Sequence, residues 1–381
     1  MKKKVSILSA IMLLLLTSCN NKLNNSLPVL STENDQYVAE YYNNYDEGRI
    51  IGGFDGNDGM PSKFLDYETM KSTVLCSKPN CTHNNSECVA KNIGICPMIT
   101  QNGTYFFKSN YGVKEEKEGK RKFYIDSKLC KVSLESSEIE IISNFKDCVP
   151  ADTRGYVLHN NVIYFTADDM CPMIDEYGVI SYSNIGGTHY LCSIELDSGK
   201  YTNYGSVFDG DKKFEGANAS SSAMIMGVYN NKLLLNYEFC KSYEDISAGM
   251  FTELMFEFDF NEKKLIESDI PTKPVFVDSD TIVYYDDSIK KCIIIDESGK
   301  RELDMEKVTC ASVQNNKLFF RDDKNQFALK WYDLSDLSIH NVKEMNCYMP
   351  ICMYNGSYIL IIGDKTVKLT EEELLALDKE K

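Results

Sequence analysis

The sequence predicts an all-β protein that closes into a β-propeller of six blades, with seven blades as the alternative. Residues that favour strands recur in short runs rather than at helical spacing, in a chain of 381 residues with 24 Tyr and 18 Phe. Two kinds of turn also repeat along the chain, at intervals of roughly forty to seventy residues. Repeats of that length are typical of propeller blades, and a β-sandwich or a β-helix is the structural alternative.

The first nineteen residues predict export and a lipid anchor. Three lysines follow Met1, and the apolar run from Val5 to Leu16 is too short to cross a bilayer but suits a secretory signal. The run ends in Leu16 to Cys19 (LTSC), which matches the bacterial lipobox, where the cysteine thiol is acylated and the signal is removed. An ordinary signal peptide with a chance cysteine is the alternative.

These signals divide the chain into three parts. We expect residues 1–18 to be a lipoprotein signal peptide, and lipidation at Cys19, with palmitate among the acyl chains, to hold the mature protein in the membrane. Residues 19–36 have no sustained pattern and predict a flexible tether, followed by the propeller domain over residues 37–381. The predicted location is the extracytoplasmic side of the cell membrane.

One set of repeats consists of strands that run into an acidic or polar turn. Its six members are Lys63 to Asp66, Cys130 to Ser136, Cys192 to Ser198, Met255 to Asp259, Cys292 to Ser298 and Leu329 to Asp333. Three of them begin with a cysteine at the same position of the repeat. Because equivalent positions in a ring are too far apart to bridge, we expect these three cysteines to be buried thiols.

A second set consists of turn dipeptides, each of which precedes an apolar strand. Asparagine and glycine prevail among them because both tolerate the positive φ that tight turns require. The six dipeptides are Asn102-Gly103, Asn160-Asn161, Asn230-Asn231, Ser279-Asp280, Asn315-Asn316 and Asn355-Gly356. Two sets of six predict six blades.

The two ends of the propeller are expected to close the ring. Lys63 to Leu75 lacks a clear partner pair ahead of it, and Asn355 to Leu369 has only two strands, so the two segments can complete one blade together. If Arg49 to Phe54 is a strand of a separate blade, the count becomes seven. A helix over residues 370–379 follows, because Thr370 and Glu373 have capping-box spacing. Its leucines at 374, 375 and 377 are expected to face the body and cover the ring closure.

Five metal-binding or bridge-forming side chains crowd into residues 76–97, a stretch rich in Asn, Ser and Pro that predicts an inserted loop. They are Cys76, Cys81, His83, Cys88 and Cys96. Three thiolates and the imidazole, spaced C-x4-C-x-H-x4-C, can complete a tetrahedral zinc site, although His83 then needs a tight turn. Disulfides, for example Cys76 with Cys81 and Cys88 with Cys96, are the alternative in an exported protein, and free thiols are the third possibility. We expect a crosslinked insert and not a catalytic centre.

These features resemble a group of lipoproteins from anaerobic Gram-positive bacteria. The resemblance covers Lys63 to Leu369, and its specific motifs are Leu16 to Cys19 and the Cys76 to Cys88 loop. The propellers of this group are similar to those described as low-density-lipoprotein-receptor-related or TolB-like. The resemblance implies a propeller fold and implies no particular activity.

Composition and motifs narrow the function. A formal charge of -16 argues against a nucleic-acid partner. The chain has no G-x-S-x-G, GxGxxG or phosphate-loop motif, and His159, His189 and His340 are expected to be solvated or hydrogen-bonded rather than general bases. We therefore expect a binding or interaction module that presents a propeller face to an envelope protein, a peptide or a glycan. An envelope hydrolase or lyase that uses carboxylates around the channel is the alternative.

Overall fold

The structure is a computed structural model, which describes most of the chain after residue 35. The described residues are 36–38, 44–45, 47–51, 61–85, 87–93, 97–100, 102–117, 120–133, 138–146, 148–151, 155–169, 171–174, 180–183, 188–208, 221–240, 247–248, 250–305, 307–322, 328–342, 347–362 and 365–379. The predicted signal peptide, the predicted lipidation site Cys19 and the loop residue Cys96 lie outside them.

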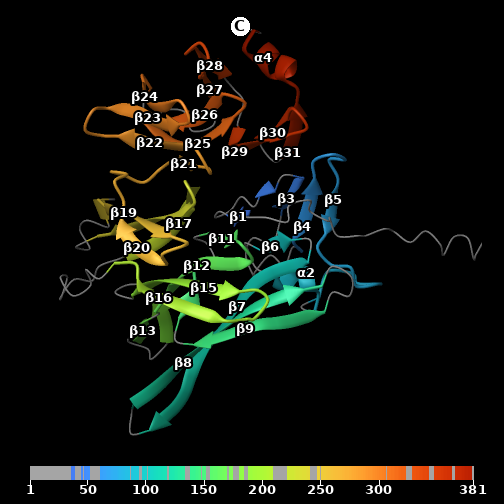
Figure 1. Cartoon of the computed structure of the whole chain (residues 1–381). Coiled ribbons are helices and arrows are strands. Elements are labelled where there is room, and N and C mark those ends of the chain that lie inside the picture. The colour runs from blue at the N-terminus through green and yellow to red at the C-terminus, as the bar shows by residue number, and fades with distance from the viewer. Residues whose placement is uncertain are drawn as a thin grey trace, which may run out of the picture.

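Seven antiparallel sheets follow one another along the chain and are arranged in a ring (Figure 1), here numbered blades 1 to 7. Blade 1 contains β2 (Asn44–Tyr45), β3 (Gly48–Ile51), β4 (Lys63–Asp66) and β5 (Ser72–Val74). Blade 2 contains β6 (Met98–Thr100), β7 (Gly103–Lys117), β8 (Lys120–Val132) and β9 (Ile139–Lys146). Blade 3 contains β11 (Tyr156–His159), β12 (Val162–Asp168), β15 (His189–Glu195) and β16 (Tyr201–Ser206). The short strand β10 (Val149–Pro150) also pairs with β12.

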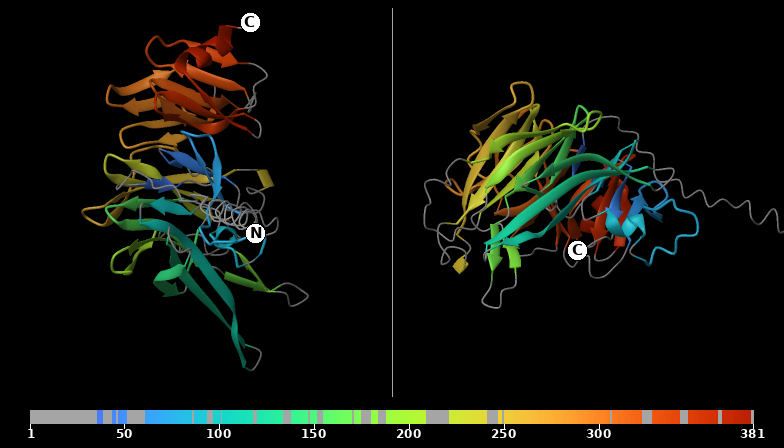
Figure 2. Two further views of the ribbon diagram at one scale, coloured as in Figure 1. Left: turned by 90° about the vertical axis from the view of Figure 1, so that its right-hand side faces the viewer. Right: turned by 90° about the horizontal axis from the view of Figure 1, so that it is seen from below.

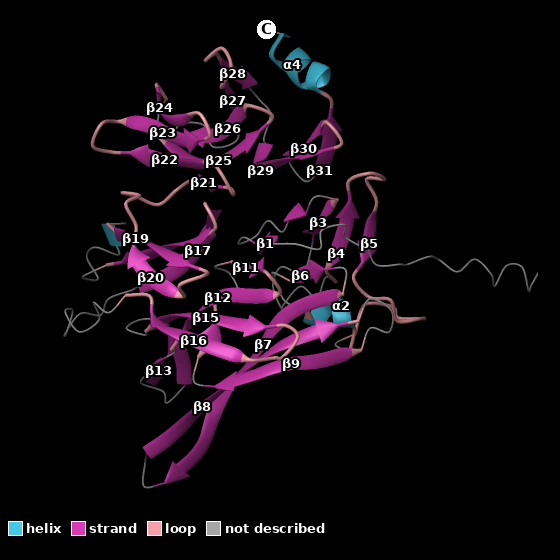
Figure 3. Ribbon diagram, viewed as in Figure 1, coloured by secondary structure: helices cyan, strands magenta, loops and turns pink. Residues whose placement is uncertain are grey.

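Blades 4 to 7 repeat the same order, and Figure 3 shows how strands dominate the molecule. Blade 4 contains β17 (Ser221–Tyr229), β18 (Lys232–Phe239), β19 (Thr252–Asp259) and β20 (Lys264–Glu267), and blade 5 contains β21 (Phe276–Val277), β22 (Ile282–Asp286), β23 (Lys291–Asp296) and β24 (Gly299–Leu303). Blade 6 contains β25 (Val308–Gln314), β26 (Lys317–Asp322), β27 (Leu329–Asp333) and β28 (Ile339–Val342). Blade 7 contains β29 (Cys347–Tyr354), β30 (Ser357–Ile362) and β31 (Lys365–Leu369). The all-β propeller prediction is confirmed.

Each pair of neighbouring blades shares a buried apolar cluster. Phe64 of blade 1 and Phe106 of blade 2 belong to one such cluster, and Leu65 of blade 1 and Ile359 of blade 7 belong to another. Five further clusters join blades 2 to 7 in sequence. Seven interfaces are what a closed ring of seven blades requires, and burial of these faces is the main stabilising contribution.

The predicted count of six blades is wrong, and the alternative of seven is confirmed. The Asn-type turns join the first and second strands of blades 2 to 7, whereas the strands with acidic turns are the third strands of blades 1 to 6. The two sets of six are therefore offset by one blade. In blade 1, Tyr45 pairs with Gly48, and the two residues between them are Asp and Glu, which lack the Asn-Gly signal. Arg49 lies in β3, as the seven-blade alternative requires.

The ring does not close by a blade shared between the two ends, so that prediction is also wrong. The early strands β4 and β5 form blade 1 with β2 and β3, and the late strands β29 to β31 form blade 7. The two sheets meet through their faces, where Leu65 and Tyr67 pack against Ile359. Apolar packing between two separate sheets thus closes the ring, without a shared blade.

The N-terminal strand β1 (Gln36–Val38) joins a distant blade. It pairs with β11 in blade 3, with Gln36 opposite Leu158 and Val38 opposite Tyr156. Because β11 is the first strand of its blade and contacts β17, the first strand of blade 4, β1 lies on the edge of blade 3 that faces the ring axis. It gives that edge a partner.

The C-terminal helix α4 (Glu371–Lys379) confirms the predicted capping box. The Thr370 backbone N–H donates to Glu373 Oε2 at 2.8 Å, and the Glu373 N–H donates to Thr370 Oγ1 at 3.3 Å. Leu374 is fully buried, but the helix packs on β28, β30 and β31, so it covers the junction of blades 6 and 7 rather than the ring closure. Within the described part of the chain, no helix has the length and apolar character needed to span a membrane.

Two long strands of blade 2 extend beyond the ring as a two-stranded arm, drawn in teal in Figure 2. Strands β7 and β8 pair from Thr104 opposite Val132 out to Lys117 opposite Lys120. Strand β9 pairs with β8 only over Asp126–Val132. The outer parts of β7 and β8 therefore pair only with each other among the described strands. A second ribbon, β13 (Cys171–Ile174) with β14 (Ile180–Ser183), connects β12 to β15 in blade 3.

Candidate functional site

The Cys-rich loop connects blade 1 to blade 2, between β5 and β6. Cys76 follows β5 closely, and Cys88 precedes the short helix α2 (Val89–Asn92). Val89 and Ile93 are buried in the cluster shared by blades 1 and 2, together with Cys76 and Cys88 themselves. The Cys-rich loop is therefore anchored in the core, because α2 supplies apolar side chains to this cluster.

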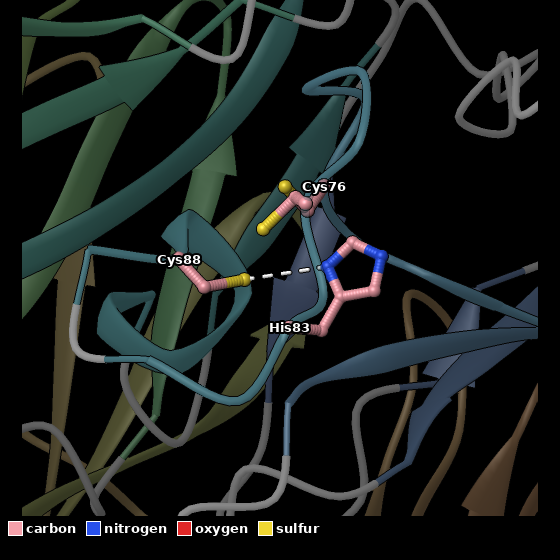
Figure 4. A group of neighbouring side chains, drawn as sticks. Cys76, His83 and Cys88 are labelled. Carbon is pink, nitrogen blue, oxygen red and sulfur yellow. Dashed lines mark hydrogen bonds between the residues drawn. The ribbon is translucent and has the colours of Figure 1, made fainter.

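Four donor side chains of this loop converge on one point, and Figure 4 labels three of them, Cys76, His83 and Cys88. The ligand atoms of Cys76, Cys81, His83 and Cys88 all lie within 4.8 Å of one another, and Cys88 Sγ lies 3.5 Å from His83 Nδ1. Zinc bonds of about 2.3 Å to sulfur and about 2.0 Å to nitrogen place tetrahedral ligands roughly 3.5–3.8 Å apart. The cluster is thus close to the size of a tetrahedral zinc site.

The backbone of the loop is folded so that these donors meet. His83 has φ of +58° and Asn80 has φ of +61°, so both residues adopt the left-handed conformation of tight turns. The Cys81 N–H donates to the Lys78 carbonyl at 3.3 Å, and the Cys88 N–H donates to the Asn85 carbonyl at 3.2 Å. The tight turn that the short spacing of Cys81 and His83 demands is present.

The surroundings of the thiols differ in their effect on acidity. A hydrogen bond from the His83 backbone lowers the pKa of Cys81, whereas burial raises the pKa of Cys88 to about 11. A bound zinc ion would stabilise the thiolate form of every cysteine ligand. With three sulfur atoms and one nitrogen, the protein would fill all four positions, which is the pattern of structural rather than catalytic zinc sites.

The structure brings together four of the five predicted loop residues. Cys76, Cys81 and Cys88 are not bridged to one another. Cys96 lies outside the described residues, so its pairing with Cys88 stays a prediction.

The three cysteines of the acidic-turn repeat are buried, as predicted. Cys130, Cys192 and Cys292 lie in the third strands of blades 2, 3 and 5, each at most 2% exposed. Burial raises the pKa of Cys292 to about 12. These residues fill inter-blade clusters as small apolar side chains.

Two of the remaining histidines are hydrogen-bonded packing residues, as predicted. His159 stacks on Phe260 with ring centroids 3.9 Å apart, and its Nε2 lies 2.8 Å from Asn160 Nδ2. His340 stacks on Trp331, with centroids 4.7 Å apart.

His189 has a different environment, which the sequence did not indicate. Its Nδ1 lies 2.5 Å from Asp168 Oδ1 and its Nε2 lies 2.8 Å from Ser221 Oγ. Asp168 and His189 face each other on β12 and β15 of blade 3, whereas Ser221 begins β17 of blade 4. Because this group forms across two blades, neither Asp168 nor Ser221 could be selected from local spacing.

The carboxylates of the described residues do not form the raised-pKa group that a channel enzyme would use. Every described carboxyl whose pKa departs from its usual value is lowered, by turn hydrogen bonds or lysine partners. These carboxyls are Glu195, Asp259, Asp286, Asp287, Asp304, Asp333, Asp336, Glu371 and Glu373. They are distributed over blades 3 to 6 and α4 and stay ionised near neutral pH.

No protein-family model matches the sequence, and no curated protein matches it. Among solved structures, an oligogalacturonate lyase in complex with manganese is 10% identical with a TM-score of 0.42, over 90% of this chain and 100% of that chain. A polysaccharide lyase, ulvan lyase, is 9% identical with a TM-score of 0.38, over 93% and 95%. The acylaminoacyl peptidase of Pyrococcus horikoshii is 11% identical with a TM-score of 0.37, over 91% and 54%. At these identities and TM-scores, none of the three bears on what this chain binds or does.

Proposed function

We propose that the protein is a lipid-anchored binding module on the extracytoplasmic side of the membrane, and that the arm formed by the outer parts of β7 and β8 contacts its partner. The observation that carries this proposal is the pairing pattern of blade 2. Residues of β7 and β8 beyond Asn110 and Asp126 pair only across the hairpin among the described strands. The closed ring then serves as the rigid support.

An isolated two-stranded ribbon is at best marginally stable in water, so the arm gains most from a partner that covers it. Its two edges, which have no further partner among the described strands, suit an extended polypeptide that adds as a further strand. The sequence over residues 114–122 is KEEKEGKRK, and charged residues in edge strands oppose indiscriminate edge pairing. We therefore propose a protein or peptide partner rather than a glycan.

The Cys-rich loop supports the base of the arm. Phe106 of β7 and Cys130 of β8 belong to the same buried cluster as Cys76 and Cys88. Zinc held by Cys76, Cys81, His83 and Cys88 would crosslink the connection between blades 1 and 2 at that cluster. We propose a structural zinc ion whose loss loosens the root of the arm.

The test compares detergent-solubilised full-length protein with a variant whose arm is shortened by joining Asn110 to Asp126 through Asn-Gly. A photo-crosslinking residue is placed either on the arm or on the β13–β14 ribbon, which is a hairpin of the same kind and serves as control. The expected result is an envelope protein that is crosslinked from the arm alone and that no longer co-purifies with the shortened variant. Equal crosslinking from both ribbons would overturn the proposal. Co-purification of the envelope protein with the shortened variant, in the same amount as with the wild type, would also overturn it.

The alternative of an enzyme that uses channel carboxylates gains no support from the described residues. Every described carboxyl whose pKa shifts is shifted downward, so none of these carboxyls is suited to act as a general acid near neutral pH.

A further inference from the structure

We propose that Ser221, His189 and Asp168 form a nucleophilic site that cleaves carboxylic esters with apolar acyl groups. The site lies at the junction of blades 3 and 4, apart from the arm of blade 2, and is independent of the proposed binding function.

The geometry matches the roles of a nucleophile, a base and an orienting carboxylate. Ser221 Oγ lies 2.8 Å from His189 Nε2, and His189 Nδ1 lies 2.5 Å from Asp168 Oδ1. When the Nδ1 proton is donated to Asp168, the lone pair of Nε2 is left to accept the hydroxyl proton of Ser221. The Ser221–His189 distance falls within the range of about 2.6–3.2 Å that proton transfer requires, and the shorter contact with Asp168 orients the imidazole.

The three side chains of this hydrogen-bonded group differ in their exposure to solvent. Asp168 is 4% exposed and His189 is fully buried, whereas Ser221 is partly exposed at the start of β17. The carboxylate and the imidazole are thus shielded from water, and the hydroxyl lies at the accessible end. A hydrogen-bonded tie between two blades has no need for this gradient, whereas a nucleophile must be reached by its substrate.

Aromatic side chains lie beside the imidazole. The ring of Tyr237 is 5.7 Å from that of His189, and Phe208 lies 5.1 Å from Tyr237. Tyr237 is buried and Phe208 is partly buried in the same apolar cluster. Phe208 is the partly exposed ring of the two, and an apolar contact with it would favour apolar acyl groups over charged ones.

The proposed reaction conserves atoms and protons. Ser221 Oγ bonds to the ester carbonyl carbon while its proton passes to His189 Nε2. The tetrahedral adduct then breaks its bond to the alcohol oxygen, which takes the proton from Nε2 and leaves as the alcohol. Water attacks the acyl-serine in the same way, with His189 as base, and releases the carboxylic acid and the free hydroxyl.

The test uses full-length protein in detergent, a fluorophosphonate probe and p-nitrophenyl butyrate. We expect labelling of Ser221, located by peptide mass spectrometry, together with ester hydrolysis. Both should be lost in Ser221→Ala and lowered about 10²- to 10⁴-fold in His189→Asn. Ser222→Ala is the matched control, because neighbouring strand residues face opposite sides of the sheet.

Asp168 is proposed to act through His189. Its role is therefore tested by the rate at which the fluorophosphonate probe labels Ser221. Asp168→Asn should slow the labelling of Ser221, and Asp168→Glu should restore part of the rate. Asp169→Asn is the neighbouring control and should have no effect.

If Ser221→Ala does not fold, Ser221→Cys keeps the question open to experiment. The new thiol should be alkylated by iodoacetamide faster than its His189→Asn double variant. No labelling of Ser221 in folded wild-type protein, or labelling and alkylation that do not depend on His189, would overturn the proposal and leave a structural tie between two blades.

Discussion

The thiol of Cys352 in blade 7 donates a hydrogen bond to the hydroxyl of Tyr67 in blade 1 at 3.4 Å, across 285 positions of the chain. Tyr67 is fully buried, and its ring lies edge-on to Tyr354 with centroids 6.2 Å apart. The Lys368 ammonium donates to the Tyr67 carbonyl at 3.3 Å. Burial raises the pKa of Tyr67 well above its usual value, so the hydroxyl stays protonated. These contacts connect the last blade to the first.

Removing the Tyr67 side chain should therefore weaken the ring closure. We expect Tyr67→Ala to lower the free energy of unfolding by about 3–5 kcal/mol, because it leaves a cavity between two sheets. Tyr67→Phe should cost only about 0.5–1.5 kcal/mol, since it removes the hydroxyl alone. Urea unfolding measures both changes. Tyr124→Ala is the exposed control, and an equal cost for Tyr67→Ala and Tyr124→Ala would refute this role.

Zinc should be bound at one ion per chain through Cys76, Cys81, His83 and Cys88. We expect His83→Ala and Cys88→Ala to lose the metal and lower the thermal midpoint, because the loop loses its crosslink. Lys78→Ala is the control within the same loop, since its side chain is not among the four donors. Metal analysis of anaerobically purified protein gives the stoichiometry.

Disulfides in this loop would respond to chelators and reductants in the opposite way to a zinc site. A bridge resists chelators and yields to reductants, and it lowers the intact mass by about two daltons for each pair. Stoichiometric zinc that a chelator removes supports the metal site. Alkylation of Cys76, Cys81, Cys88 and Cys96 in native, metal-free protein would contradict both forms of crosslink.

Cys19→Ala should abolish acylation and release the protein from the membrane fraction. The reason is that the acyl chains are the proposed anchor, and without the thiol there is no attachment point. Incorporation of labelled palmitate and membrane fractionation are the measurements. A variant that still incorporates palmitate would show that the lipobox interpretation is wrong.

Glu371 should make stability depend on pH. Burial favours its neutral form, but the hydrogen bonds from Lys317 at 2.7 Å and Tyr358 at 2.6 Å outweigh this and lower the pKa of Glu371. A folded-state pKa below the unfolded value of about 4.3 means that the stabilisation is complete above that value. It is lost as the pH falls through the lower, folded-state pKa.

The matching variant is Glu371→Gln, which should cost roughly 1 kcal/mol at pH 7, because solvent reaches part of this pair. It should also flatten the fall in stability below pH ~5. Glu372→Gln, on the exposed side of the same helix turn, is the control. Equal acid slopes for wild type and Glu371→Gln, measured by urea midpoints from pH 3 to 7, would exclude the contribution.

The sequence predicted the blade unit well because its signals are local. Asn160, Asn161, Asn230 and Asn231 all adopt positive φ, as their residue types favour. The count failed because blade 1 lacks an Asn-type turn and blade 7 ends in a helix instead of an acidic turn. Neither exception can be recognised before the pairing of every strand is known from the structure.

The Cys-rich loop and the Ser221–His189–Asp168 group show the same difference between local and tertiary signals. The sequence alone placed Cys76, Cys81, His83 and Cys88 among five candidates of one loop, and they meet because the turns of that single segment bring them together. Only the tertiary structure placed Ser221 beside His189, because the two residues lie on different blades and meet through packing of one sheet on the next. Turns depend on a few neighbouring residues, whereas contacts between blades depend on how all seven sheets bury their faces around the ring.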